Sequence, residues 1–224
     1  MMDGREVDID LSTDCLISVL TRLPQLTWLS AGYTENFTDQ VLEMWHFTGT
    51  CNHLRTLDLD TCDYLTEHAL REFLYIYGHQ LQGLNLAGLP YLLEPFWQFL
   101  FPIIRNIRIL VMGIAEDCCS KVSSRIHIDQ FLNTISDKCK YIERLEIRWD
   151  QETLRFSDKS SKFIDLLRLR CMRLRSLVLC DGKYYELVKS NFERTGRVSV
   201  VRTNTMCQTS MVQLLDYFAD LMFN

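Results

Sequence analysis

The 224-residue sequence has no apolar run long enough to cross a bilayer and no dense block of lysine and arginine. Its nearest apolar stretch, around residues 96–104, is shorter than the roughly 18 residues that a membrane helix requires. The first residues are polar and acidic, without the apolar core of a signal peptide. With a net charge of −5, the chain has no overall field that attracts nucleic acid. We therefore expect neither a membrane nor a nucleic acid as its partner.

Motifs that carry chemistry are also missing. There is no Gly-x-Gly-x-x-Gly, no phosphate-binding Gly-Lys-Ser/Thr and no Gly-x-Ser-x-Gly, and the five histidines form no His-x-x-x-His pair. The nine cysteines contain no Cys-x-x-Cys pair, which argues against a zinc site, and their odd number argues against a disulfide framework. We expect no enzyme, no cofactor and no metal, and a reducing location in the cytoplasm, the nucleus or both.

What the sequence does contain is a repeated frame of leucines. Its fullest copy is Cys51-x-x-Leu54-x-x-Leu57-x-Leu59-x-x-Cys62. The three leucine positions recur, with substitutions, at Leu26/Leu29/Ala31, Leu81/Leu84/Leu86, Ile107/Leu110/Met112, Ile142/Leu145/Ile147 and Leu174/Leu177/Leu179, and an eroded seventh copy is expected at Val198/Val201. A repeat of this period predicts a solenoid of stacked units.

Each unit is expected to be a strand, a turn and a helix. Leu57 and Leu59 are two residues apart, so they share one face of a strand, and the intervening residues face the other way. Apolar residues at helical spacing come before the next strand, as at Val41/Leu42/Trp45 and Leu70/Phe73/Leu74, and helix-capping residues precede them at Ser12, Thr38 and Thr66. Strands that alternate with helices predict an α/β fold with a parallel sheet.

The Cys51–Cys62 run resembles the cysteine-containing leucine-rich repeats of F-box proteins, the substrate receptors of cullin-type (SCF-like) ubiquitin ligases. Cys139 and Cys171 stand in the register of Cys51. The resemblance implies a leucine-rich repeat solenoid, a ribonuclease-inhibitor-like horseshoe with parallel strands on its concave face and helices on its convex face. We expect a cap or partial repeat in residues 1–24 and about six repeats in 25–205, with loop insertions near 116–125 and 150–162. A capping helix is expected in residues 206–224.

The resemblance also implies a function. It is substrate recognition for such a ligase or a role as a regulator derived from one; the alternative is a structural adaptor or assembly factor without a ubiquitin role. The F-box is not found in this sequence, because residues 12–24 are expected to form the helix of the first repeat. Cullin ligase components are therefore expected as partners only through an F-box upstream, in a longer form of which this chain is a fragment or isoform.

The concave face is the predicted site for a protein partner or substrate. The frame places the following residues on it: Trp28, Ser30, Thr56, Asp58, Asp60, Asn85, Ile109, Val111, Arg144, Glu146, Arg148 and Val178. Trp28 is of the type found at binding hot spots, and Arg144 and Arg148 suit acidic or phosphorylated groups. Ile109 and Val111 are either an apolar contact surface or covered by a neighbouring loop or chain end. We expect Trp28→Ala or Arg144→Ala to weaken partner binding with little change in thermal stability.

Overall fold

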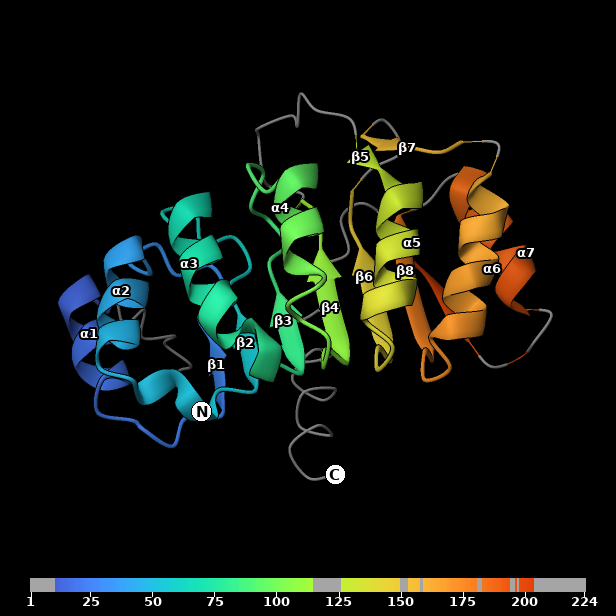
Figure 1. Ribbon diagram of the computed structural model, residues 1–224. Coiled ribbons are helices and arrows are strands. Elements are labelled where there is room, and N and C mark those ends of the chain that lie inside the picture. Colours follow the sequence, from blue (N-terminus) through green and yellow to red (C-terminus); the bar gives the residue numbers. More distant parts are fainter. Residues whose placement is uncertain are drawn as a thin grey trace, which may run out of the picture.

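The computed structural model describes residues 11–114, 126–149, 153–157, 159–180, 183–193, 196 and 198–203. Within them, a parallel sheet has the strand order β1-β2-β3-β4-β6-β8-β9, so each strand lies beside its neighbour in the repeat sequence (Figure 1). The strands are β1 (Trp28–Ser30), β2 (Thr56–Asp58), β3 (Gly83–Asn85), β4 (Ile109–Met112), β6 (Arg144–Ile147), β8 (Ser176–Cys180) and β9 (Ser199–Thr203). The predicted α/β class and parallel sheet are confirmed.

Helices cover one face of this sheet. They are α1 (Thr13–Leu20), α2 (Asp39–Phe47), α3 (Glu67–Tyr77), α4 (Glu94–Leu100), α5 (Ile128–Lys138), α6 (Ser160–Arg170) and α7 (Lys183–Glu193), with the 3-10 turns η1 (Thr50–His53) and η2 (Gly78–Gln80). Helices α1 to α6 lie side by side in chain order, each against the next (Figure 1). None of the helices in the described ranges is long and apolar enough to span a bilayer.

The helix starts follow from capping residues. The Ser12 hydroxyl accepts a hydrogen bond from the Cys15 amide at 3.3 Å, and the Thr66 hydroxyl accepts one from the Ala69 amide at 3.2 Å. Each cap satisfies an amide that has no partner inside its own helix. Thr38 precedes α2 at the same position, but its side chain makes no capping bond. The predicted starts are therefore confirmed, and the predicted capping bond forms at two of the three.

The core lies between the sheet and the helices, and leucines of successive strands line up in it. Leu57 is paired with Leu84, Leu84 with Leu110, and Leu110 with Leu145, and all four side chains are buried. Leu145 continues the row to Leu177. This row confirms the prediction that the leucines of the repeated frame face the core. It also shows why no unit is sufficient alone, since each leucine is covered by the next repeat.

The frame cysteines belong to the same scaffold. Cys51, Cys139 and Cys171 are fully buried. The Cys139 thiol donates to the Phe101 carbonyl at 3.7 Å, and the Cys171 thiol donates to the Cys139 carbonyl at the same distance. Burial raises the pKa of both Cys51 and Cys139 to about 12. Protonated, enclosed thiols of this kind act as compact packing groups.

Tight turns follow the first strands and require a left-handed residue. Thr61 (φ 54°) occupies this place after β2, and Gly88 (φ 75°) occupies it after β3. A β-carbon at Gly88 would clash with the Thr61 side chain and lie 2.9 Å from the Thr61 nitrogen. Gly32, in the turn after β1, has room, since its nearest neighbours would be 3.4 Å away. The close approach of one turn to the next therefore fixes glycine at position 88.

Two expectations need correction. In the seventh copy Val198 is buried in the core, as expected, but the strand residue that pairs with Leu177 and packs against the core is Val200, while Val201 pairs with Val178. The predicted frame was one residue out of register, and in a strand such a shift changes the face. The predicted insertion at 150–162 contains strand β7 (Leu154–Arg155), paired with β5 (Ile126–His127), and helix α6 begins inside it at Ser160. The predicted 116–125 insertion and 206–224 helix lie outside the described residues, as do residues 1–10.

Candidate partner-binding surface

The strand register brings the predicted site residues onto one face of the sheet, opposite the leucine row. One row across the strands is Trp28, Thr56, Gly83, Ile109, Arg144 and Ser176. The next is Ser30, Asp58, Asn85, Val111, Glu146 and Val178. The prediction that the site residues share a face is therefore confirmed for those within the strands, while Asp60 and Arg148 lie just after β2 and β6. We call this side of the sheet the inner face.

Hydrogen bonds connect the inner-face side chains of β1, β2 and β3. The Ser30 hydroxyl donates to Asp58 Oδ2 at 3.0 Å, and the Asn85 amide Nδ2 donates to Asp58 Oδ1 at 2.9 Å. The Asp60 backbone amide also donates to Asp58 Oδ1, at 3.2 Å. Both oxygens of the Asp58 carboxylate are thus engaged by neighbouring strands and by its own chain.

A second group connects β6, β8 and the residue after β6 with Asp60, which follows β2. Arg148 Nη1 donates to Asp60 Oδ2 at 3.0 Å, and its Nη2 donates to Glu146 Oε2 at 3.2 Å. Glu146 also accepts from Arg144 Nε at 2.6 Å, and Arg144 Nη1 reaches the Ser176 hydroxyl at 3.5 Å. We call the two groups together the inner-face ladder: Ser30, Asp58, Asp60, Asn85, Arg144, Glu146, Arg148 and Ser176.

Most of the ladder is buried, with only Ser30 and Arg148 partly exposed, although the sequence predicted these residues as contacts for a partner. Asn85 and Glu146 have no exposed surface, and Asp58 is 1% exposed. Buried members of the site also include Thr56, Asp60, Arg144 and Val178. The physical reason is that these polar groups bond to each other: Arg148 pairs with Asp60 and Glu146, and Arg144 pairs with Glu146. The sequence-based reading supposed that these groups would meet a partner.

Burial also changes the chemistry of Asp58. Its pKa is raised, mainly because burial disfavours the charged carboxylate, and the nearby Asp60 charge adds to this. The hydrogen bonds from the Asp60 amide, Ser30 and Asn85 act in the opposite direction. Within the described residues, no group of three or more His, Cys, Asp and Glu side chains could hold a metal ion. The carboxylates of Asp58 and Asp60 are held by hydrogen bonds from neighbouring residues of the chain.

The apolar part of the inner face is covered as well. Ile109 and Val111 are 2% and 0% exposed, and with Ala87 they form a small buried cluster separate from the main core. Of the two readings of this pair, the one in which both side chains are covered is confirmed. A bare apolar contact surface at these positions is excluded.

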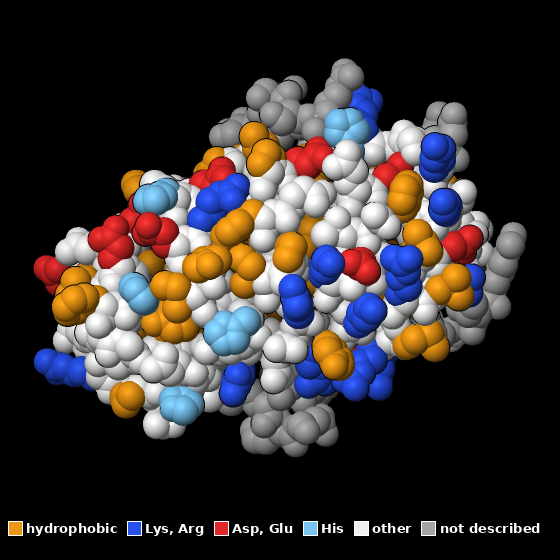
Figure 2. Space-filling model, viewed as in Figure 1, with side chains coloured by type: hydrophobic (Ala, Val, Ile, Leu, Met, Phe, Trp, Pro, Cys, Tyr) orange, Lys and Arg blue, Asp and Glu red, His pale blue; other side chains and the backbone are white. Residues whose placement is uncertain are grey.

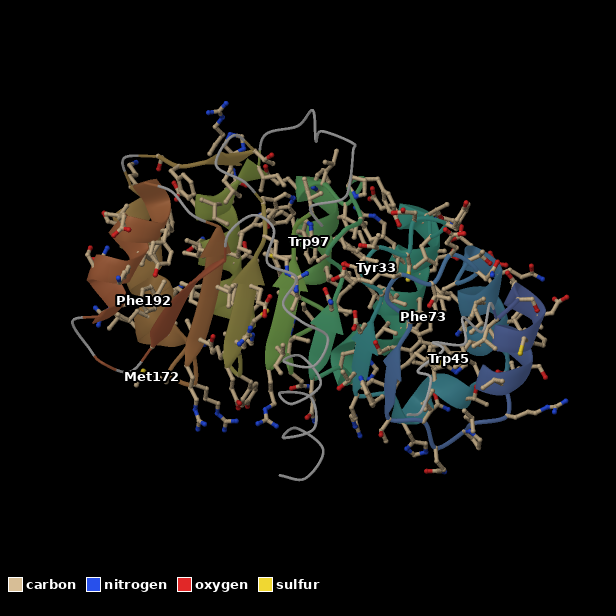
Figure 3. All side chains as sticks on the ribbon, turned by 180° about the vertical axis from the view of Figure 1, so that it is seen from behind. Tyr33, Trp45, Phe73, Trp97, Met172 and Phe192 are labelled. Atoms are coloured by element: carbon tan, nitrogen blue, oxygen red, sulfur yellow. The ribbon has the colours of Figure 1, made fainter. Side chains whose placement is uncertain are left out.

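The part of the inner face that stays accessible lies at its β1 end. Trp28 and Ser30 are partly exposed, and Tyr33, in the turn after β1, is 47% exposed. Figure 3, which looks at the molecule from behind, shows where Tyr33 lies relative to the strands. The sequence reading missed Tyr33 because it counted strand positions only, and Tyr33 stands in a left-handed turn outside the frame, a conformation that a tyrosine does not signal in sequence.

A scan against protein-family models and a search of curated proteins find no match to this chain. The leucine-rich repeat resemblance therefore rests on the residues of this sequence.

Proposed function

We propose that the chain is a protein-binding module of the leucine-rich repeat type. We propose further that it recognises substrates for a cullin-type ubiquitin ligase, or regulates such a ligase. The observation that carries the first part is the register of the main sheet: each strand lies beside the next in the chain, with equivalent frame positions paired. Stacked units of this kind expose an extended surface to a partner.

The accessible end of the inner face supplies the contacts proposed for this module. Trp28 and Tyr33 are large aromatic side chains, a type enriched at binding hot spots. The buried ladder beside them keeps β2, β3, β6 and β8 in fixed positions. The ladder thus acts as the support for the surface, while the exposed residues make the contact.

Co-purification tests this proposal. The longest natural form of the protein is tagged, isolated from its own cells, and its partners are quantified by mass spectrometry. Recovery of a cullin and its adaptor supports the ligase role, and their absence, with other proteins retained, favours the adaptor alternative. Recovery of no specific protein contradicts the binding module.

A variant pair locates the contact. Trp28→Ala is expected to reduce partner recovery, whereas Phe47→Ala is expected to leave it unchanged. Phe47 is a matched control, because its side chain is 83% exposed and lies at the end of α2, on the helical side of the sheet. Equal recovery with both variants would remove Trp28 from the contact.

A further inference from the structure

Charge is unevenly divided along the chain. Residues 1–100 contain four arginines and no lysine, against fourteen Asp and Glu. Residues 101–224 contain 20 Lys and Arg against 15 Asp and Glu. The division persists among the described residues, since residues 11–100 hold three Lys and Arg against ten Asp and Glu, and stacking of the repeats in chain order places it along the sheet. Figure 2 shows acidic side chains over the early helices and basic side chains gathered over the lower ends of the later ones. On this face, acidic side chains predominate over the early helices, and basic side chains predominate at the lower edge of the later ones (Figure 2).

The basic residues come from equivalent loops of successive repeats. The loops that connect α4 to β4, α5 to β6 and α6 to β8 all lie at the edge of the sheet where its strands begin. Six exposed cations stand on or beside these loops, and we call them the basic edge: Arg105, Lys138, Lys140, Arg170, Arg173 and Arg175. Their spacing in sequence hides the cluster, which forms only when the repeats stack.

The positive field of the basic edge is visible in the acid that lies within it. The pKa of the exposed Asp137 carboxyl is lowered, first by a hydrogen bond from Lys138 and then by the charges of Lys138, Lys140 and Arg170. By contrast, Arg108 is neutralised by Glu143, with Nε and Oε1 3.0 Å apart. Among the described residues, no carboxylate lies within ion-pair distance of Lys140, Arg170 or Arg175. The basic edge thus keeps a surplus of positive charge.

Apolar surface lies between these cations. The Arg173 guanidinium stands over the Tyr141 ring, 5.0 Å from its centre, and Tyr141 is still 47% exposed. Met172, labelled in Figure 3, is 64% exposed. A hollow of about 370 Å³ lies beside them, lined by Arg105, Asp137, Lys138, Lys140 and Tyr141. Tyrosine, methionine and arginine are residue types enriched at protein interfaces.

We infer that the basic edge binds an acidic segment of a partner protein, one that carries an apolar side chain among its carboxylates. The carboxylates meet the cations, and the apolar side chain lies against Tyr141 and Met172. This inference rests on the proposed function in that it takes the partner to be a protein, and it adds the chemistry of that partner and the surface that receives it.

Two features favour a short acidic peptide over nucleic acid. The same edge of the first half, in the loops before β1, β2 and β3, carries only Arg22 and Arg55 as Lys, Arg, Asp or Glu side chains, so a long polyanion extending past the basic edge would gain little further attraction. A short segment makes all of its contacts within the basic edge itself. Neighbouring strands lie about 4.8 Å apart and helices about 10 Å, so three repeats span roughly 10–20 Å at this edge. An extended peptide of about six residues, at about 3.3 Å per residue, covers that span.

Fluorescence anisotropy with the full chain tests the inference. The probe is a labelled peptide of about six residues made of Glu and Asp with one central Leu; a second probe has Gly in place of Leu. The Leu peptide is expected to bind, more weakly as salt rises, and the Gly peptide is expected to bind more weakly than the Leu peptide. The double variant Lys140→Glu/Arg175→Glu is expected to lower the affinity for the Leu peptide about tenfold.

Arg55→Glu is the matched control. Arg55, Gln82, Arg108, Glu143 and Arg175 occupy equivalent positions, since the backbone amide of each donates to the carbonyl of the one before it. Arg55 is exposed and stands on the same edge in the acidic half, so its reversal should change the affinity less than about twofold. Circular dichroism confirms that both variants are folded.

Three results would overturn the inference. One is equal affinity of the double variant and the wild type for the Leu peptide. Another is tighter binding of a single-stranded oligonucleotide of matched charge, which would point to nucleic acid. The third is sedimentation of the wild type as an oligomer and of the double variant as a monomer, because the basic edge would then bind a second copy of this chain. In each case the proposed role as a protein-binding module is tested independently, by co-purification.

Discussion

Glu146 is the residue whose change most directly probes the inner-face ladder. It is fully buried and accepts hydrogen bonds from Arg144 and Arg148. The substitution Glu146→Gln keeps the size and shape of the side chain and removes its charge. Two buried guanidinium groups then share a neutral amide, whose nitrogen cannot accept from either of them.

The expected cost follows from the burial of these groups. Breaking a buried ion pair by removing one partner destabilises a protein by about 3–5 kcal/mol, because the remaining charge stays out of water without compensation. For a chain of this size, that corresponds to a fall in Tm on the order of 10 °C. Arg144→Ala removes one partner of Glu146 and creates a cavity, so it should lower the free energy of unfolding by a similar amount. The sequence-based expectation that this variant leaves thermal stability nearly unchanged is therefore withdrawn.

Glu143→Gln provides the comparison. Glu143 stands immediately before β6 and pairs with Arg108 through two hydrogen bonds, of 3.0 and 3.1 Å, but the two side chains are 22% and 24% exposed. Solvent screens such a pair, and the same substitution should cost only about 0–1 kcal/mol. Urea and thermal unfolding of both variants, followed by circular dichroism, measure the difference. Equal destabilisation by the two substitutions would refute the assignment of Glu146 to a buried, stabilising ladder.

Three further predictions concern turns, caps and pH. Gly88→Ala should lower the free energy of unfolding by about 1–3 kcal/mol, because a β-carbon there fits neither the backbone angle nor the available space. Gly32→Ala should cost less than half as much. Equal urea midpoints for the two variants would contradict this. Thr66→Ala should cost about 1 kcal/mol of unfolding free energy and Thr38→Ala distinctly less, since only the first hydroxyl caps a helix; the reverse order would contradict the capping geometry. The pKa of Asp58 is raised in the folded state, so the folded protein binds this proton more tightly than the unfolded chain does. The free energy of unfolding of the wild type, relative to that of Asp58→Asn, should therefore fall as pH rises through the folded-state pKa. Urea midpoints measured from pH 4 to 8 test this, and a constant difference would exclude it.

The scaffold could be predicted from the sequence because its signal is local and repeated. The spacing of Leu57 and Leu59 fixes their common face, and helical spacing identifies Trp45 and Phe73 as core residues. The prediction failed in the seventh repeat, where valines stand at 198, 200 and 201 and the alternation cannot choose between faces. Only pairing with β8 settles that register.

The state of the site could not be predicted in the same way. Which residues share the inner face follows from the frame, but whether water reaches them depends on contacts between distant parts of the chain. Arg148 and Asp60 are 88 residues apart in sequence and meet only when β2 and β6 stand in one sheet. The basic edge is hidden for the same reason, since Arg105, Lys140 and Arg173 come from separate repeats.

Partner binding through the basic edge is tested most directly by quantitative co-purification from cells with the wild type, the double variant Lys140→Glu/Arg175→Glu and the control Arg55→Glu. We expect a partner with an acidic segment to be recovered with the wild type and the control and to be lost with the double variant. Recovery of the same partners in the same amounts with all three proteins would contradict a role for this surface.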